Sequence, residues 1–488
     1  MNLRIIRLCL DIYCTSPKAF DTIKQHLILP SKRLIRYYKN AIPPKSGWDH
    51  DVMQWCSKEA KNLGLNEEQR WSGLIFDEMA IQEDLQFSSV NGKTKLVGAV
   101  SLGKTYEDTQ FLINGKDEVE IASKVMQFCL VTDSGFRFAL SHFPVKTMPA
   151  ISLLEEFWRG VELCQRYGFR IYWLVCDGGE PNRSFIKLLF PHGSDASQHN
   201  FVAYNMHTGK ELVVMLDCKH NFKKIRNNLE KSTLKDKSPR QLMLNGNSIL
   251  FQHWKDAYNW DRNEHSIKVN EHLSDDHFNL TPKSRMRNKL AEDLLDKKML
   301  YLMEQFKIHL FDQGKRAQAE ELNETIRLLT FTSELIDLFT RKDKLTSCYD
   351  ARIIKAKEFI DHLKTWKGNT KTAKEFISDK LWFDLQAMVI GLEQVVKIKS
   401  RAFPDTGIIK PVIINQDVIE NIFCQVRGSN GQNNNPTYLS YGSTITSVNI
   451  GQDAISKKGN TRGIKECLTR ACLPVEHPFK KKKKNHND

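Results

Sequence analysis

The sequence predicts an α/β fold in which a long helical block interrupts a sheet domain. The runs GLIFDEMAI and IYWLVCDGG are apolar and contain or end in acidic residues, a pattern typical of buried strands that carry acids at their ends. Between them lies ISLLEEFWRGVELCQRYGF, whose apolar residues recur at helical spacing. Residues 286–400 read as helical, are rich in Glu, Lys and Leu, and carry hardly a strand signal. Strands that alternate with helices indicate an α/β sheet, and the long block indicates a helical insertion.

The length and composition are those of a globular chain with more than one domain. At 488 residues the chain is too long for one compact core, so we expect about two or three domains. Hydrophobic residues make up 41% and charged residues 27%, the balance of a soluble protein. No stretch approaches the ~18 uninterrupted apolar residues of a membrane helix, so we expect no membrane partner. The start, MNLRIIRLCLDIYC, lacks a small-residue cleavage site and predicts a buried helix, not a secretory signal.

The net charge indicates the class of binding partner, and the cysteine content indicates the redox state of the compartment. The formal net charge is +14, which suits a polyanionic partner, although a merely basic soluble protein has the same signature. The 11 cysteines contain no CxxC pair. This pattern indicates a reducing compartment and argues against a disulfide framework or a zinc site of four thiolates.

Residues 1–70 are expected to form short helices. SPKAFDTIKQHLI and SKRLIRYYKN each begin with a serine that can cap a helix. The second segment carries Lys32, Arg33 and Arg36, which are candidate DNA contacts of a helix-turn-helix. A solvated basic helix explains the same residues.

Residues 71–222 are expected to form the first part of the sheet domain. GLIFDEMAI is followed by KLVGAVSLG, with an Asn-Gly turn signal before it, which predicts a β-hairpin. MQFCLVT and FRFALSHFPV predict two further strands. The next helix has Leu154, Phe157, Val161 and Cys164 on one face and ends at Gly168. After IYWLVCDGG we expect a helix around 184–189 and a strand, ELVVMLD.

The sheet domain is expected to resume late in the chain. IIKPVIINQDVIENIFCQVRG has the pattern of a strand followed by a helix, and HPFKKKKKNHND ends a polar tail. The expected divisions are an N-terminal helical segment, the first part of the core, a helical insertion, the last part of the core and a basic tail, at residues 1–70, 71–222, 223–408, 409–450 and 451–488.

Three acidic residues lie where strands and helices of this pattern would bring them together. Asp77 is near the end of the first strand, Asp177 ends the strand after the long helix, and Glu420 lies on the late helix. Phosphodiester transfer uses hard oxygen ligands around two divalent ions ~3.5–4 Å apart. A single Asp at a strand end is more often a turn or cap residue, so spacing alone does not establish a metal site.

The chain resembles the P-element transposase family, which includes the THAP-domain transposases. The resemblance rests on blocks in the family's order that span nearly the whole chain: LPSKRLIRYY, WSGLIFDEM, CDGGEPNRSF, DCKHNFKKIRNN, HFNLTPKSRMRNKLAEDLL and INQDVIENIFCQVRGSNGQNNNPT. The resemblance implies an RNase H-like catalytic core interrupted by a mainly α-helical, GTP-binding insertion. It implies that Asp77, Asp177 and Glu420 are the catalytic DDE triad and bind Mg²⁺ or Mn²⁺. The implied partners are DNA, GTP and further copies of the chain on DNA, and the implied location is the nucleus.

The block DCKHNFKKIRNN contains further candidate DNA contacts. It fits the family pattern D-x-x-H-x-x-K-x-x-R-N, with Lys219 where the family often has proline. Lys223 belongs to the motif, and Lys224 and Arg226 are expected to face outward, where they can meet phosphates. A solvated helix capped by Asp217 explains these residues equally well. Asp217 also competes with Asp177 for the role of second catalytic ligand, and the strand-end context favours Asp177.

A nucleotide-binding motif with another mechanism is also present. Residues 98–105, GAVSLGKT, match the phosphate loop G-x-x-x-x-G-K-T. That loop needs a helix directly after its lysine, and YEDTQFLINGKD opens poorly as one. The residues also read as the second strand of the hairpin, so we do not expect Lys104 to bind nucleotide.

The guanine nucleotide implied by the resemblance has a different candidate contact. Asp417 lies one helical turn before Glu420, and a carboxylate can accept both N–H donors of guanine. A helix N-cap is the alternative role for Asp417. The segment with Phe278, Lys283 and Met286 resembles family sequence near the nucleotide, and NNNPT at 433–437 is a turn by composition.

Two features bear on targeting. The C2CH zinc-binding THAP domain with which family members usually begin has no matching Cys/His spacing here, so we expect phosphate contacts with little base discrimination. The run Lys480–Lys484 is a candidate nuclear import signal, or a tail that only aids solubility.

Overall fold

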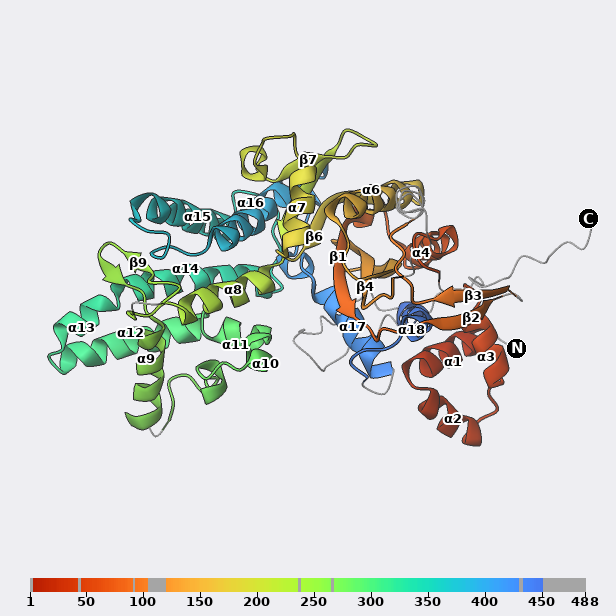
Figure 1. The fold of residues 1–488 in the computed structure, drawn as a ribbon, viewed down its shortest axis with the longest axis horizontal. Coiled ribbons are helices and arrows are strands. Elements are labelled where there is room, and N and C mark those ends of the chain that lie inside the picture. Colours follow the sequence, from red (N-terminus) through yellow and green to blue (C-terminus); the bar gives the residue numbers. More distant parts are fainter. Residues whose placement is uncertain are drawn as a thin grey trace, which may run out of the picture. The chain divides into compact units, whose positions relative to one another are not determined.

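The structure, a computed structural model, describes residues 3–42, 45–90, 93–103, 120–235, 238–264, 267–429 and 433–450. The chain forms two compact units (Figure 1). Unit 1 comprises Met1–His192, Tyr204–Leu212 and Gln416–Asp488, and unit 2 comprises Gly193–Ala203 and Val213–Asn415.

Unit 1 contains a mixed sheet with helices from both ends of the chain. Its helices are α1 (Leu3–Thr15), α2 (Pro17–His26), α3 (Lys32–Lys39), α4 (His50–Asn62), η1 (Glu68–Arg70), α6 (Ala150–Arg166), α7 (Glu180–Leu188), α17 (Asp417–Ser429) and α18 (Tyr438–Ile450). Its strands are β1 (Trp71–Ala80), β2 (Gln86–Val90), β3 (Lys93–Val97), β4 (Lys124–Thr132), β5 (Arg137–Val145) and β6 (Arg170–Cys176). The main sheet runs in the order β5-β4-β1-β6, antiparallel except that β6 is parallel to β1. Strands β2 and β3 form a separate antiparallel ribbon.

One face of this sheet is an aromatic core. Phe76 of β1 lies opposite Phe128 of β4 and contacts its ring, with the centroids 5.4 Å apart. Phe185 of α7 meets Phe76 at 5.6 Å, edge to face, and Trp48 meets Phe128 at 5.3 Å. Residues directly opposite each other in a sheet project to the same face, so α7 and the Trp48 segment bury this face.

The other face of the sheet carries polar side chains, and the C-terminal helices α17 and α18 pack against it. Gln127 of β4 lies opposite Asp77 and is fully buried, and its Oε1 accepts a hydrogen bond from the Tyr441 hydroxyl of α18 at 2.7 Å. On the edge strand β5, Asn449 accepts from the Ala139 amide at 3.0 Å and donates to its carbonyl at 2.8 Å. Helix α17 packs on β1 and β4, as the blue helices beside these strands in Figure 1 show. The face that carries Asp77 is therefore the face that α17 and α18 cover.

The N-terminal helices form as the sequence predicts. Ser16 caps α2 by accepting from the Ala19 amide, and Ser31 caps α3 by accepting from the Leu34 amide. Helix α1 packs against α2, α3 and α18.

Unit 2 is mainly helical, in agreement with the helical insertion that the sequence predicts. Its helices are η2 (Ala196–His199), α8 (Cys218–Glu230), α9 (Phe251–Glu264), η3 (Asp275–His277), α10 (Pro282–Arg285), α11 (Asn288–Asp293), α12 (Lys297–Asp312), α13 (Arg316–Glu321), α14 (Asn323–Thr340), α15 (Ala351–Asn369), α16 (Asp379–Ala402) and η4 (Pro411–Ile413). It has one short hairpin, β9 (Met243–Leu244) with β10 (Asn247–Ser248). Strands β7 (Val202–Tyr204) and β8 (Glu211–Leu216) pair with each other, and the division between the units falls within both. Helices α12, α14, α15 and α16 pack in succession.

One expected strand is absent. The run IIKPVII was predicted as a strand before the late helix, but it forms one bridge, Leu345 to Ile409, and then the short 3-10 helix η4. Pro411 begins η4 and is buried. Proline has no N–H for a sheet ladder and suits the first position of a helix, which explains the difference.

The other expected elements of unit 1 are present. The hairpin forms as β2 and β3, whose paired ends Val90 and Lys93 flank the Asn-Gly signal. Helix α6 buries Phe157, Val161 and Cys164, whereas Leu154 is only half-buried. None of the described helices is long and apolar enough to cross a membrane.

Candidate active site

Asp77 lies on β1 three residues before the strand ends, on the face that α17 covers. Its Oδ1 accepts a hydrogen bond from the Glu78 amide at 2.8 Å, and its side chain is half-buried. Strand β1 is hydrogen-bonded on both sides, by β4 and by β6. Asp77 therefore lies on a central strand, and the pairing on both sides fixes the position of its backbone.

Asp177 follows β6 directly and is held by the start of the next helix. Strands β1 and β6 run parallel with Ile75 opposite Val175, and the same register continued by two residues puts Asp177 beside Asp77. Neighbouring strands are about 4.8 Å apart and residues in register share a face. A continuation of this register would bring the two residues to the same end of neighbouring strands.

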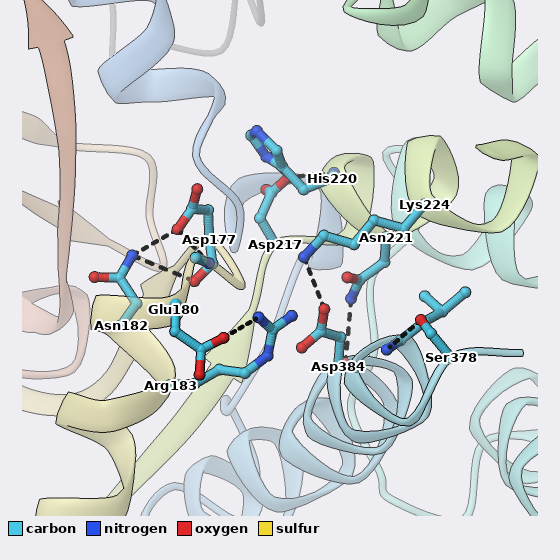
Figure 2. A network of polar contacts seen from close by, with 12 residues as sticks. Asp177, Glu180, Asn182, Arg183, Asp217, His220, Asn221, Lys224, Ser378 and Asp384 are labelled. Atoms are coloured by element: carbon cyan, nitrogen blue, oxygen red, sulfur yellow. Dashed lines mark hydrogen bonds and ion pairs between the residues drawn. The ribbon is translucent and has the colours of Figure 1, made fainter. Parts of the chain in front are cut away.

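The orientation of Asp177 is set by two donors. The Gly179 amide donates to Asp177 Oδ1 at 2.9 Å, and Asn182 Nδ2 donates to the same oxygen at 2.6 Å and to the Asp177 carbonyl at 3.3 Å (Figure 2). Asp177 Oδ2 has no hydrogen bond to any described residue. One oxygen is fixed by the protein and the other is left for a ligand.

Glu420 reaches this edge of the sheet through α17. Gln416 is fully buried, and its Nε2 donates to the carbonyl of Phe76, the residue before Asp77, at 3.1 Å. The Glu420 amide donates to the Gln416 carbonyl at 3.0 Å, and residues four apart share a helix face. Glu420 thus lies one turn along α17 from the contact that fixes the helix beside Asp77.

The donor chemistry of the three residues fits a hard divalent ion, but they are not assembled as a metal site. Carboxylate oxygens are the ligands that Mg²⁺ prefers, and within the described residues neither Asp177 nor Glu420 forms an ion pair. Across the described parts of the chain, no group of three or more His, Cys, Asp or Glu side chains has an arrangement that holds a metal ion. Asp77 and Asp177 lie on or directly after paired strands, Glu420 lies on α17, which packs on β1, and their role as a triad stays a prediction.

Asp217, the competing candidate, caps a helix. It follows β8 and begins α8, where its Oδ2 accepts from the His220 amide at 2.8 Å and contacts His220 Nδ1 at 2.9 Å. Its side chain is buried. The capping role that the sequence left open for Asp217 is present.

The expectation that Lys224 and Arg226 face outward is wrong. Arg226 is fully buried, its Nη2 donates to the Arg285 carbonyl at 2.6 Å, and burial lowers the pKa of its guanidinium. Lys224 is half-buried and pairs with the buried Asp384 at 2.7 Å (Figure 2). Lys223 is also buried.

The reason for these differences is that α8 packs on two partners inside unit 2. It contacts α11 and α16, so side chains beyond its apolar stripe are covered as well. The Asn221 amide group donates to the Asp384 carbonyl at 3.2 Å and strengthens the contact with α16 (Figure 2). Lys224 links α8 to α16 through Asp384, and Arg226 links α8 to α10 through the Arg285 carbonyl.

The basic residues of α3 are more accessible. Arg33 and Arg36 are exposed, and Arg36 Nε donates to the Tyr13 hydroxyl at 2.9 Å. Lys32 is half-buried and pairs with Asp21 at 2.7 Å. The arrangement leaves Arg33 and Arg36 as the stronger candidates for DNA contacts in this helix.

The segment that matches a phosphate loop is extended where it is described. The Ala122 amide donates to the Gly98 carbonyl, the Val100 amide donates to the Glu120 carbonyl, and Ala99 forms a bridge with Ile121. Lys104 and Thr105 lie outside the described residues. Residues 98–101 therefore continue as paired extended chain after β3.

The residues proposed for the nucleotide lie in both units. Asp417 is in unit 1, buried in the first turn of α17, three residues before Glu420. In unit 2, Phe278 stacks on Tyr258 with centroids 4.6 Å apart, while Lys283 and Met286 are exposed. The NNNPT turn is tied to the root of the ribbon, since the Gln82 amide donates to the Pro436 carbonyl at 3.2 Å. Lys480–Lys484 lie outside the described residues.

Two residues of the site were not identified from the sequence, Asn182 and Gln416. Asn182 is in the first turn of the helix that follows Asp177, and Gln416 is four residues before Glu420. The sequence did offer one signal for these two residues, because each is polar and lies about one helical turn from a predicted catalytic carboxylate.

Comparisons with known proteins agree with this architecture. The family model described as TNP-like, RNase H N-terminal domain matches residues 44–190, and the TNP-like, RNase H C-terminal domain matches residues 413–443. The structure is similar to the solved Drosophila P element transposase strand transfer complex, with a TM-score of 0.72 and 16% identity, over 93% of this chain and 92% of that one. The family models thus match two parts of the chain, and its fold is similar to that of a P element transposase. No curated protein matches it in sequence.

The family resemblance and the fold class that the sequence predicted are thereby confirmed. The chain has an RNase H-like domain, and the two segments that the family models match stop at 190 and resume at 413. The gap nearly coincides with unit 2, whose outermost residues are Gly193 and Asn415. The helical unit is thus inserted between the two parts of the RNase H-like domain.

Proposed function

We propose that this protein is a DNA transposase or a transposase-derived nuclease, with Asp77, Asp177 and Glu420 as its catalytic carboxylates. The observation that supports the proposal most is the parallel pairing of β1 and β6 up to Ile75 and Val175, each two residues before a proposed catalytic aspartate. The three residues would hold Mg²⁺ or Mn²⁺, because their donors are all carboxylate oxygens.

The proposed reaction has two steps at phosphorus. The oxygen of water attacks a DNA phosphodiester, the bond to the 3′ oxygen breaks, and a 3′-hydroxyl and a 5′-phosphate result. That 3′-hydroxyl then attacks a second phosphodiester and displaces its 3′ oxygen, which joins two DNA strands. When bound, the divalent ions supply activation of the attacking oxygen and charge stabilisation at the leaving oxygen.

The residues around the proposed catalytic carboxylates would act by holding those carboxylates in position. Asn182 and the Gly179 amide hold Asp177 Oδ1, which directs Oδ2 toward the reaction. Gln416 fixes the first turn of α17 against β1, which limits the positions that Glu420 can take. Pre-set ligand positions reduce the reorganisation that the reaction requires.

Cleavage of DNA by the whole chain tests the proposal. We expect nicking of duplex DNA that carries the element's ends in the presence of Mg²⁺ or Mn²⁺, and none with chelator. The products should have 3′-hydroxyl and 5′-phosphate ends, read by end-labelling. Metal-independent nicking would contradict the assignment.

A second candidate function is a derivative that binds DNA or protein without cutting. Binding of the same DNA with no cleavage under any divalent ion would support this candidate.

We also propose that guanine selectivity depends on Asp417 and not on Lys104. Asp417 is buried beside Glu420, and a carboxylate can accept both guanine N–H donors. An Asp417→Asn chain should lose its preference for GTP over ATP by about tenfold or more, because one charged acceptor is lost. Lys104→Ala should bind GTP as the unmodified chain does, and the reverse result would favour the phosphate-loop motif. Nucleotide binding is measured by titration of the whole chain.

We also propose that the protein is located in the nucleus and that more than one copy acts on each DNA. Both follow from chromosomal DNA as the substrate. Imaging of the tagged chain and the mass of its complex with DNA would test them, and cytoplasmic retention or one chain per DNA would contradict them.

A further inference from the structure

The β2–β3 ribbon of unit 1 exposes an apolar pair that nothing in the described structure covers. Phe87 and Leu96 lie opposite each other, and they are 76% and 40% exposed. The two strands form a sheet of their own, and each contacts the other more than any other described element (Figure 1). The pair therefore gives the ribbon a small apolar surface that a partner can contact.

The ribbon is anchored firmly at its base. The Ile81 amide donates to the Ser123 carbonyl at 2.9 Å, and the Ala122 amide donates to the Gly98 carbonyl at 2.9 Å. Gly98 has a φ of +104°, and a Cβ there would lie 2.0 Å from the Asp84 carbonyl oxygen. A two-stranded hairpin alone is marginally stable, so these contacts maintain it as a fixed arm.

The base of the ribbon is at the catalytic edge of the sheet. Strands β1 and β4 pair as far as Ala80 and Lys124, so the chain leaves this sheet three residues after Asp77 and returns to it at Lys124. Phe87 follows Asp77 by ten residues, which at full extension span no more than about 36 Å. One turn of duplex DNA has about the same length. A duplex that lies on Asp77 therefore extends far enough to meet the ribbon.

The charge of the ribbon suits DNA. Residues 86–97 contain Lys93 and Lys95 and no acidic residue, and Lys95 is exposed. Ser88 lies opposite Lys95, and the exposed Thr94 is on the same face as Phe87. Lysine, serine and threonine donate to phosphates, and an aromatic ring packs on thymine methyl groups.

We propose that the β2–β3 ribbon enters the major groove of the DNA next to the cleavage site. A major groove admits a two-stranded β-ribbon, which fits the width of the arm. The Phe87–Leu96 pair contacts base edges, and Lys95 contacts the phosphate backbone. The inference rests on the proposed function, because it takes DNA at Asp77 as the ligand.

Binding to DNA tests the arm without depending on cleavage. In a whole chain made inactive by Asp177→Asn, we expect Phe87→Ala to lower the affinity for duplex DNA about tenfold, and Phe87→Tyr to restore most of it. Lys95→Ala should reduce the slope of log affinity against log salt by about 0.9. Tyr349→Ala removes an equally exposed aromatic residue of unit 2 and serves as the matched control, which should bind normally.

A photo-crosslinking amino acid in place of Phe87 identifies the occupant. We expect it to crosslink to DNA within about one helical turn of the cleavage site. Crosslinking to a second copy of the chain, or unchanged affinity of Phe87→Ala, would overturn the proposal. A chain that binds through the ribbon but never cuts would contradict the catalytic proposal alone.

Discussion

An Asp177→Asn chain is expected to lose Mg²⁺-dependent DNA cleavage by about a thousandfold or more while it binds DNA as before. Asparagine keeps the size of the side chain and still accepts from Asn182 and Gly179 through its oxygen, so the fold should be unchanged. It removes the negative charge that a divalent ion needs at the reacting phosphate, and each ~1.4 kcal/mol of lost transition-state stabilisation costs a factor of ten. Single-turnover cleavage and duplex binding, measured on the same preparation, check both parts.

Two further variants distinguish the effect of the Asp177 carboxylate from the effect of the residue that positions it. Asp405→Asn removes an exposed aspartate of unit 2 and should cut normally. Asn182→Ala should cut more slowly and require more Mg²⁺ for half-maximal rate, because the positioning donor to Asp177 Oδ1 is gone. Full cleavage by Asp177→Asn would exclude this residue from the triad.

Gly73→Ala should lower the melting temperature of the protein by about 10 °C. Gly73 on β1 lies opposite Trp173 on β6, and an added Cβ would be 1.9–2.1 Å from three atoms of the indole ring. Trp173 is fully buried, so the ring has no free space to enter. Overpacking of a rigid core costs about 3 kcal/mol, and 1 kcal/mol corresponds to about 2–4 °C in a unit of this size.

Gly368→Ala is the matched control for this variant. Gly368 lies at the end of α15, and no atom is within 4 Å of a Cβ built there. Alanine favours a helix over glycine by up to about 1 kcal/mol, so the melting temperature should stay equal or rise slightly. Equal melting of Gly73→Ala and the unmodified chain would show that the indole does not cover Gly73. Differential scanning calorimetry of both variants provides the measurement.

The sequence was informative where local pattern and tertiary structure agree. Apolar runs identified β1, β4, β5 and β6, because these strands are buried along most of their length. Asp77 and Asp177 could be identified as candidates because each is near the end of such a run. The relation between them depends on strand register, which a single sequence does not contain.

The sequence misled where one helix has several covered faces. Phe222, Ile225 and Leu229 form one apolar stripe in α8, and the spacing of Arg226 puts this charged residue on the same face. The carbonyl to which Arg226 donates belongs to Arg285, the last residue of α10 and 59 positions later in the chain, and α11 also contacts α8. Likewise, IIKPVII is as apolar as a strand, and only its proline indicated otherwise.

The polar face of the sheet of unit 1 cannot be covered until residues 416–450 have been synthesised. Residues 71–145 supply β1, β4 and β5, but their polar face is covered by helices whose key contacts are 340 residues apart for Gln416 with Phe76 and 310 for Asn449 with Ala139. On the ribosome, this face and the edge of β5 would wait while residues 193–415 emerge. At about 5–20 residues per second, that interval lasts roughly 10–45 seconds. Unpaired strand edges and exposed sheet faces are where nascent chains aggregate, so chaperone dependence during synthesis is a cost of inserting a helical unit into a sheet domain.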